Sequence, residues 1–240
     1  MINKDDNLAD IVVTGLTKND IQLQEGDVIV IAQKIVSKAE GQLVRLRDVT
    51  PSERAIQLAS ETDKDPRIVE LILSESTELV RQKPGVLIMR HRLGHVGAHA
   101  GIDQSNIHKD NDEWALLLPV DPDKSAASLL ANFEKGSGKK LGVVITDSSN
   151  RPWRMGTIGS AIGSAGICVL EDHRGGQDLY GRELKVTLIN RVDAIAATAT
   201  LVMGETTEKI PAVVVRGLPF QASTDTAAMI NRPLEEDLFR

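Results

Sequence analysis

Cysteine is almost absent from this chain of 240 residues, in which Cys168 is the only one. A single cysteine excludes an intrachain disulfide and a zinc site made of clustered cysteines. Because Cys168 lies in the apolar run GICVL, we expect it to pack in the core. A nucleophilic role is the less favoured alternative.

Long apolar runs are missing as well. No stretch approaches the roughly 18 consecutive apolar residues that a membrane-spanning helix needs. The N-terminal sequence MINKDDNLAD lacks the apolar core of a signal peptide. We therefore expect a cytoplasmic protein that has no membrane partner.

Charge of one sign does not accumulate anywhere along the chain. The 28 lysines and arginines and the 34 aspartates and glutamates leave a formal net charge of −6. A surface of this kind offers no basic patch for a polyanion, so a nucleic-acid partner is not expected. Repeats and Pro/Gly/Ser-rich linkers are also absent, and any second domain is therefore expected to be entwined with the first.

What the chain does contain is an alternation of short strands and helices, which indicates an α/β or α+β architecture. With 41% hydrophobic residues, the chain can bury one large core or two small ones. Strands are predicted over 27–32 (DVIVIA), 141–146 (LGVVIT) and 211–217 (PAVVVRG). A hairpin with a Leu-Gly turn is predicted within 85–101.

Capping residues predict where the helices begin and end. One helix is expected to start with Thr50 as N-cap, Pro51 in the first turn and Glu53 closing a capping box. Another starts at Asp65, and a third covers 122–138 until its glycines stop it. Residues 192–204 (VDAIAATATLVMG) predict a buried helix that ends at the last glycine.

Histidines form one pattern that could be mistaken for a metal site. His91, His95 and His99 recur every four residues, which would align them on one face of a helix as zinc ligands. The glycines among them favour a hairpin instead, in which this spacing separates them along the strands. His173 lies in a polar loop, where a solvent-facing position is favoured over contact with a substrate.

Three carboxylates follow apolar segments directly. Asp103 lies in AGIDQSN, Asp147 in ITDSS and Glu205 in MGETTEK. Acidic side chains that converge from the ends of strands and helices are suited to hard divalent ions such as Mg²⁺ or Mn²⁺. Each acid taken alone is better explained as a cap or turn residue.

Cationic side chains accompany these acids. Lys34 and Lys38 follow the strand at 27–32, a position that suits phosphate or carboxylate binding. The alternative is a lysine pair whose stems pack at the start of a helix while the ammonium groups reach water. Arg151 and Arg154 bracket Pro-Trp and could hold a phosphoryl group or a carboxylate. The glycines at 156, 159, 163 and 166 match neither the Walker nor the GxGxxG pattern, so a Rossmann or P-loop assignment fails.

Five separated segments together resemble a known family. GDVIVIAQKIVSKAEG, AGIDQSN, ITDSSNRPWRMGTIGSAIG, DLYGREL and MGE…IPAVVVRG are similar, in this order, to the coenzyme F-420-0:L-glutamate ligases. The resemblance implies a GTP-dependent enzyme that adds γ-linked L-glutamate to coenzyme F-420-0. It also implies two Mn²⁺ or Mg²⁺ ions, a monovalent cation such as K⁺, and a homodimer. The implied subunit is a V-shaped α/β (α+β) mixed-sheet fold, with residues 1–240 as one catalytic ligase unit of two entwined subdomains.

The resemblance also implies roles for individual residues. One metal is expected on Asp103 and Asp147, and the second on Ser148 and Glu205. The expected GTP-binding residues are Gln33, Lys34, Lys38, Asn106, Met203, Gly204, Glu205, Thr206, Thr207, Glu208, Lys209 and Ile210.

Three features depart from the family pattern. Ser148 replaces a threonine but keeps the hydroxyl ligand, His99 stands where asparagine is usual, and the Gln33-Lys34 pair is one of several variants. The chain also starts about where a Gly-Leu-Pro-Leu-like nucleotide-contacting segment of the family ends. An upstream extension is therefore expected to strengthen GTP binding.

Phosphoryl-transfer chemistry suggests how such a ligase would work. The acid's carboxylate is expected to attack the γ-phosphorus while the metals and Lys38 neutralise the triphosphate, which yields an acyl phosphate. Arg151 or Arg154 is expected to hold the carboxylates of the incoming glutamate. A paralogue that ligates another acid or amino acid, a metal-dependent phosphohydrolase and a non-catalytic nucleotide-binding relative remain as alternatives.

Overall fold

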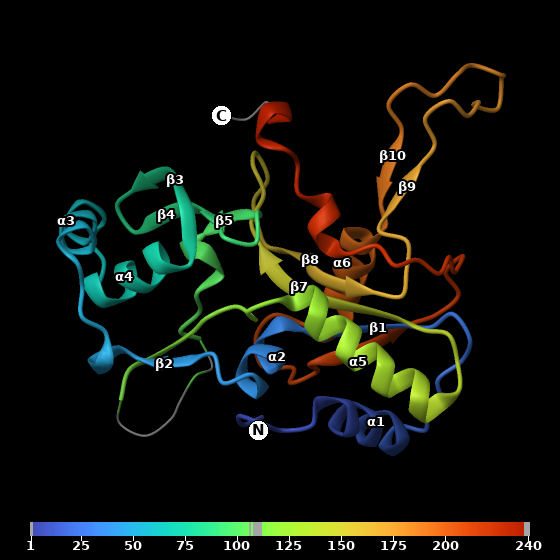
Figure 1. The fold of residues 1–240 in the computed structure, drawn as a ribbon, viewed down its shortest axis with the longest axis horizontal. Helices are drawn as coiled ribbons and strands as arrows, with labels where there is room; N and C mark the ends of the chain where they lie inside the picture. Colours follow the sequence, from blue (N-terminus) through green and yellow to red (C-terminus); the bar gives the residue numbers. More distant parts are fainter. Residues whose placement is uncertain (1, 106, 108–111, 238–240) are drawn as a thin grey trace.

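The computed structural model describes residues 2–105, 107 and 112–237. A four-stranded sheet in the order β11-β1-β7-β8 forms its centre (Figure 1). These strands are β1 (Val28–Ala32), β7 (Gly142–Ser149), β8 (Ile158–Ala165) and β11 (Ala212–Val215). Only β1 and β7 are parallel, while β11 and β8 pair antiparallel at the two edges. The sheet is therefore mixed, as expected, and it belongs to an α+β fold.

Helices cover both faces of this sheet because its strands are apolar on both sides. One face packs against α1 (Leu8–Lys18), α2 (Gln33–Ala39) and α5 (Pro122–Ser137). The other face packs against α6 (Arg191–Met203). Alternate residues of β1 therefore enter two different cores.

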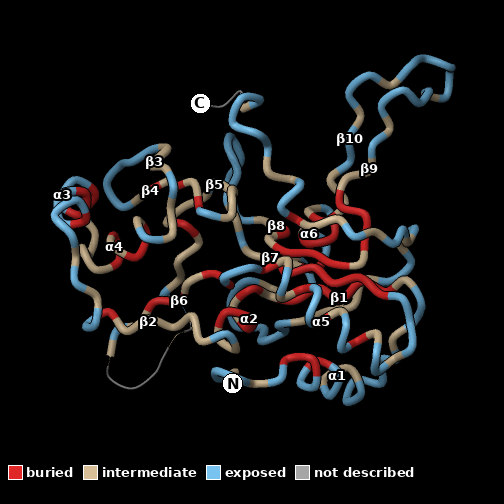
Figure 2. The backbone as a smooth tube through the Cα atoms, in the orientation of Figure 1, coloured by how far each residue is buried: buried red, intermediate tan, exposed pale blue. Residues whose placement is uncertain are grey.

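A third core lies apart from the sheet, in the segment between α2 and α5 (Figure 2). It is built from the helices and from the hairpin strands of that segment. The elements are β2 (Leu43–Arg45), η1 (Leu46–Asp48), α3 (Glu53–Thr62), α4 (Pro66–Ser74), β3 (Ser76–Lys83), β4 (Val86–His91), β5 (Val96–Ala98), η2 (His99–Gly101) and β6 (Trp114–Leu116). The pairing of β2 with β6 closes this segment where the chain leaves and re-enters the central part.

Two further segments extend from the sheet. The strands β9 (Leu170–Asp172) and β10 (Leu188–Asn190) begin a long hairpin that projects away from the rest of the molecule (Figure 1). The C-terminal segment contains η3 (Ala227–Ile230) and η4 (Leu234–Glu236). The Asp123 carboxylate accepts the backbone N–H groups of residues 227 and 228, which ties this segment to the start of α5.

Most of the predicted elements are confirmed, with differences at their ends. The predicted Thr50 cap is wrong: α3 begins at Glu53, because the Ser52 hydroxyl accepts the Ala55 N–H and Glu70 in turn binds Ser52. Asp65 caps α4 as expected, while α5 continues through residue 136 and ends at the left-handed Gly138. Cys168 is buried, as predicted. No helix in the described part of the chain is long and apolar enough to cross a bilayer.

The predicted hairpin is present, but its histidines are not far apart as expected. The His91 and His95 rings stack with centroids 4.8 Å apart. They flank a tight turn in which the His91 N–H donates to the His95 carbonyl. Residues that close a turn are cross-strand neighbours, so sequence spacing along the strands does not separate them.

The glycine row after residue 155 is explained by helix packing. A Cβ at Gly159 would lie 2.6 Å from the Ala196 carbonyl oxygen of α6, and one at Gly163 would lie 2.4 Å from the Pro122 carbonyl oxygen of α5. Both glycines lie on β8 and let a helix approach the strand closely. These two glycines therefore allow α6 and α5 to approach β8 closely from opposite faces of the sheet.

Candidate functional site

The candidate site is centred on Asp147 and Ser148, which lie within β7 and not beyond its end as the sequence suggested. The strand continues through them because β8 pairs Asp147 with Ser160 and Ser148 with Gly159. Successive residues of a strand point to opposite sides, so the two side chains diverge from one another. Each can therefore serve a different part of the site.

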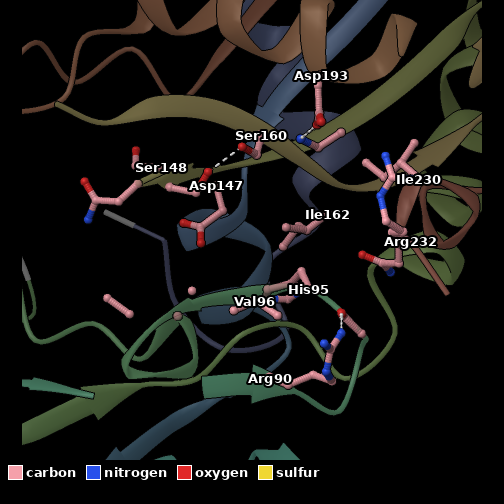
Figure 3. A pocket seen from close by; sticks show the side chains of 18 of the residues that line it. Arg90, His95, Val96, Asp147, Ser148, Ser160, Ile162, Asp193, Ile230 and Arg232 are labelled. Carbon is pink, nitrogen blue, oxygen red and sulfur yellow. Dashed lines mark hydrogen bonds between the residues drawn. The ribbon is translucent and has the colours of Figure 1, made fainter. Parts of the chain in front are cut away.

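Two cavities meet at this pair of residues. The first, which we call the α6-side cavity, has a volume of about 90 Å³ and is lined by residues 32–34, 146–148, 200 and 203–205. The second, the hairpin-side cavity, has a volume of about 340 Å³. It lies between the β4–β5 hairpin, the sheet and the C-terminal segment (Figure 3). Both include Asp147 and Ser148 in their lining.

Lys34 and Asp103 form an ion pair beside the α6-side cavity. The Lys34 Nζ lies 2.6 Å from the Asp103 Oδ2 and donates to the Ser105 hydroxyl at 3.0 Å. Asp103 is held in place by a bridge to Leu116 of β6. Burial opposes ionisation of Asp103, but the Lys34 ammonium and the Ser105 N–H keep the pKa of this carboxyl below its ordinary value.

Asp147 has the opposite electrostatic environment. Burial, together with the negative charges of Asp103 and Glu205, raises the pKa of Asp147 to about 7. Hydrogen bonds from the Ser148 backbone and the Gln33 side chain oppose this shift without cancelling it. The site therefore concentrates negative charge around Asp147, which is the condition under which a bound cation is most strongly favoured.

Ser148 connects β7 to the loop that follows α6. Its hydroxyl donates to the Glu205 Oε2 at 2.5 Å. The loop itself is folded by Glu208, whose carboxylate accepts the Thr206 N–H at 2.9 Å. The chain thus brings an acid at residue 205 next to a hydroxyl at residue 148, 57 positions away.

Lys38 lies one turn after Lys34 on α2 and is half-buried. Burial is the main cause that lowers the pKa of Lys38, and the Lys34 ammonium lowers this pKa further. The Asp103 carboxylate opposes both effects. A partly desolvated cation next to another cation gains more from an added anion than an exposed lysine does. The α2 lysines are therefore suited to a phosphate.

The structure brings part of the predicted site together. The α6-side cavity includes Gln33, Lys34, Asp147, Ser148, Met203, Gly204 and Glu205. Thr206, Thr207 and Glu208 belong to the exposed loop beside it, whereas Lys209 and Ile210 line a different, largely apolar groove next to α1. Asn106 lies outside the described residues.

Other predicted residues lie elsewhere. Arg151 and Arg154 are exposed in the turn between β7 and β8, and neither lines the two cavities at Asp147. His173 is paired with Glu171 at 3.0 Å in the β9–β10 hairpin. The predicted role of Arg151 or Arg154 in holding glutamate stays a prediction, while the exposed side chain of His173 agrees with the solvent-facing position that we favoured.

Sequence reasoning missed the residues that complete the hairpin-side cavity. Arg90 comes from β4, Asp193 from the first turn of α6 and Arg232 from the C-terminal segment. Arg90 alternates with apolar residues on its strand, a pattern that indicates only an outward-facing side chain. No local signal relates these three positions to Asp147.

The donors around Asp147 fit a divalent cation by their chemistry. Asp103, Asp147 and Glu205 supply carboxylate oxygens and Ser148 a hydroxyl, the ligand types of Mg²⁺ and Mn²⁺. Asp103 and Glu205 both raise the pKa of Asp147, as expected for three carboxylates that lie close to one another. Within the described ranges, however, no three histidine, cysteine or acidic side chains already form a closed ligand group. Asp103 is engaged by Lys34, and Glu205 by Ser148.

Comparison with known proteins identifies the family. The family described as F420-0:gamma-glutamyl ligase matches residues 1–217, which include every acid, lysine and hydroxyl of the α6-side cavity. The chain belongs to this family.

Proteins with the name coenzyme F420:L-glutamate ligase are similar over nearly their whole length. The family member of Methanothermobacter thermautotrophicus is 41% identical over 100% of this chain and 95% of its own. Those of Methanococcus maripaludis and Methanopyrus kandleri are 42% and 43% identical, and the alignments cover 99% and 98% of this chain. In both, 92% of the relative is covered.

Proposed function

We propose that this protein is a GTP-dependent ligase that joins L-glutamate through a γ-linkage to coenzyme F420-0. Membership of the F420-0:gamma-glutamyl ligase family supports the ligation, and the relatives' names specify coenzyme F420 and L-glutamate. The donor set at Asp147 supports two Mn²⁺ or Mg²⁺ ions, and we include a monovalent cation such as K⁺ by resemblance to the family. The reaction class is that of an acid–amino-acid ligase.

The observation that carries this proposal is the meeting of two cavities at Asp147 and Ser148. In-line phosphoryl transfer needs a donor and an acceptor that approach one phosphorus atom from different sides. The α6-side cavity, with Lys34 beside it, suits the terminal phosphates of the nucleotide. The hairpin-side cavity then admits the carboxylate of the acid to the same phosphorus.

The chain's own residues prepare both reactants. Asp103, Asp147, Ser148 and Glu205 would hold the divalent ions, which supply positive charge to the reacting phosphates when bound. Lys34 and Lys38 add two ammonium groups from α2. Gln33 is buried at the start of the same helix, and Ser37 donates to its side-chain oxygen at 2.9 Å. This hydrogen bond orients the amide toward Asp147.

The proposed chemistry proceeds in two transfers. A carboxylate oxygen of the acid bonds to the γ-phosphorus of GTP, the bond to the β-phosphate oxygen breaks, and GDP leaves. The amino group of glutamate then attacks the acyl carbon, loses a proton, and displaces inorganic phosphate. The acyl phosphate provides a better leaving group than the hydroxide of an unactivated acid.

Product analysis tests this proposal. The protein is incubated with GTP, Mn²⁺, L-glutamate and coenzyme F420-0, and the products are measured by mass spectrometry together with GDP. We expect the cofactor to gain glutamyl residues, with one GDP formed for each. Phosphate release that is independent of glutamate would indicate a phosphohydrolase instead. GTP binding without turnover would indicate a non-catalytic nucleotide-binding protein.

A further inference from the structure

The hairpin-side cavity has a rim that the proposed phosphoryl transfer does not use. Its inner wall contains Asp147 and Ser148, and its opposite side contains Arg90 and Arg232 (Figure 3). Its volume of about 340 Å³ lies at the lower end of the range for small-molecule sites. The space suits an amino acid next to the reacting end of a larger acid.

Arg90 is already neutralised by the protein. Its Nε lies 3.1 Å from the Glu78 Oε2, and its guanidinium also pairs with Asp237 at 3.5 Å. The Arg90 Nη1 also donates to the Gly94 carbonyl at 3.3 Å. With two carboxylates and a carbonyl around it, this guanidinium joins the hairpin to the C-terminal segment and has little positive charge left for a ligand.

Arg232 differs from Arg90 in this respect. Its side chain makes no hydrogen bond or ion pair with any residue in 2–105, 107 or 112–237, and it is exposed at the rim of the cavity. An arginine guanidinium presents a planar fork of donors that matches a carboxylate. Among the two arginines of the cavity lining, Arg232 is therefore the one available to an anionic group.

The backbone next to Arg232 is held against the hairpin. The Asn231 Nδ2 donates to the Leu93 carbonyl at 2.9 Å. Gly94 has a φ of 97° and approaches Asn231 so closely that a Cβ there would lie 2.9 Å from the Asn231 Nδ2. Ile230, on the other side, packs against the core beneath α6. Arg232 thus extends from a fixed stretch of chain, which reduces the entropy lost on binding.

Two acids also belong to the lining of the cavity. Asp147 and Asp193 both line it, and Asp193 is fixed by the Ala161 N–H at 2.8 Å and the Asn190 amide at 2.6 Å. An amino acid with a second carboxylate carries one ammonium group and two anionic groups. Asp193 keeps an acid in this lining when Asp147 holds a divalent ion, and Arg232 supplies the cation at the rim. A cavity of this kind orients such a molecule with one carboxylate at the rim and its amino group toward the interior.

We propose that the hairpin-side cavity binds the incoming glutamate, and that Arg232 holds one of its carboxylates so that its amino group faces the Asp147 wall. This inference rests on the proposed ligase function. It transfers to Arg232 the role that the sequence suggested for Arg151 or Arg154. Arg232 also lies beyond residue 217, outside the part of the chain that the family match covers.

Steady-state kinetics on single variants test the assignment. For Arg232→Gln we expect the KM for glutamate to rise at least about tenfold, since a charge-assisted hydrogen bond contributes that much or more. The KM values for GTP and coenzyme F420-0 should stay within about twofold of the wild type. Arg232→Lys should recover part of the loss, because it restores the charge without the fork. Arg54→Gln, on the exposed surface of α3, is the matched control and should behave as the wild type.

Calorimetric titration of glutamate in the presence of GDP and Mn²⁺ separates this inference from the proposed function. Weaker glutamate binding to Arg232→Gln than to the wild type supports the assignment even if no ligation occurs. Equal binding to the two proteins, or no binding to the wild type, overturns it even if ligation is observed. A rise in the KM for coenzyme F420-0 in place of glutamate would also overturn it, because Arg232 would then bind the acid.

Discussion

Single side chains at this site differ sharply in their electrostatic role. Asp27, Asp103 and Asp147 are all acids within or next to the central part of the fold, but only Asp147 has a raised pKa. Asp27 faces Arg216 and Asp103 faces Lys34, so each has a cation of its own. Asp147 instead faces two further acids. This difference identifies Asp147 as the acid whose charge a ligand has to balance.

The first prediction concerns Asp147. Asp147→Asn keeps the size of the side chain and removes one negative charge from the proposed metal site. We expect ligation to fall by at least ~10²-fold, the usual scale for loss of an electrostatic catalytic group. The measurement is the ligation rate at saturating Mn²⁺, and circular dichroism checks that the fold is retained. Asp20→Asn, on the exposed turn after α1, is the control; near-normal rates for both variants would refute the assignment.

The second prediction concerns Lys38. Lys38→Met keeps the apolar stem and removes the ammonium group. If this group contacts phosphate, the free energy of GTP binding should become less favourable by ~1.5–3 kcal/mol, the range for a charged hydrogen bond. Titration calorimetry with GTP and Mn²⁺ gives the affinity, and a thermal melt should be almost unchanged. Lys18→Met at the exposed end of α1 serves as the comparison. A Lys38 variant that melts early and binds GTP normally would show a structural lysine.

At the scale of elements, the edge strand β11 of the central sheet and its neighbour β1 are joined by an ion pair whose carboxylate is buried. Asp27 directly precedes β1, and Arg216 directly follows β11. Two charged contacts at 2.8 Å connect them, and the Gln24 N–H also donates to Asp27 at 2.8 Å. The Asp27 side chain is fully buried. The contact therefore fixes the antiparallel register of β1 and β11 at the point where β1 begins and β11 ends.

The third prediction follows from this ion pair. Burial opposes ionisation of Asp27, but Arg216 and the Gln24 N–H lower its pKa below the ordinary value of 3.8. A carboxyl whose pKa is lowered by folding stabilises the protein above its unfolded pKa, and this stabilisation is lost as the pH falls through the folded pKa. Asp27→Asn should therefore reduce the free energy of unfolding at pH 7 by about 2 kcal/mol, as expected for a charged hydrogen bond with a partly exposed partner.

Urea unfolding at neutral and acidic pH measures this effect. The difference between the wild type and Asp27→Asn should shrink once the pH falls below 3.8, the ordinary value for this carboxyl. Asp20→Asn, which replaces an exposed aspartate, should leave the unfolding free energy unchanged. A pH-independent difference would mean that packing, and not the ion pair, stabilises this corner.

At the scale of the whole molecule, the β9–β10 hairpin exposes apolar side chains far from the central core. Leu179 is 99% exposed, Tyr180 91% and Val186 85%. Projecting apolar residues of this kind often mark a surface that another protein covers. A second copy of the same chain in a twofold-symmetric dimer is the commonest arrangement. The homodimer that the sequence suggested is therefore our expectation for the assembly.

The fourth prediction tests this assembly. Light scattering at micromolar concentration should give about twice the chain mass of 26.0 kDa. A variant with both Leu179→Asp and Tyr180→Asp should shift toward the monomer mass, because two buried charges would oppose the contact. Ile56→Asp, which replaces an exposed apolar residue on α3, provides the matched control. A wild-type monomer would refute the dimer, and an unchanged dimer in the double variant would place its interface elsewhere.

The sequence alone determined those features that depend on short-range interactions. Five consecutive residues from Val28 form a strand because they are apolar and mostly β-branched. Asp65 and Pro66 begin a helix because the cap and the fixed φ act within one turn. The family was also evident from motifs whose order along the chain needs no structure. The predicted cap at Thr50 was wrong, because Glu70 of the following helix accepts a hydrogen bond from Ser52 and Ser52 caps α3 instead.

Only the tertiary structure decided which side chains share a cavity. Asp147 and Arg232 are separated by the whole of β8, the projecting hairpin, α6 and β11, so no periodicity relates them. The C-terminal segment brings them to one cavity through contacts with α5 and the β4–β5 turn. In the same way, pairing with β8 carried β7 through Asp147 and Ser148. Such contacts depend on the packing of distant segments, whose free energies cannot be read from local sequence.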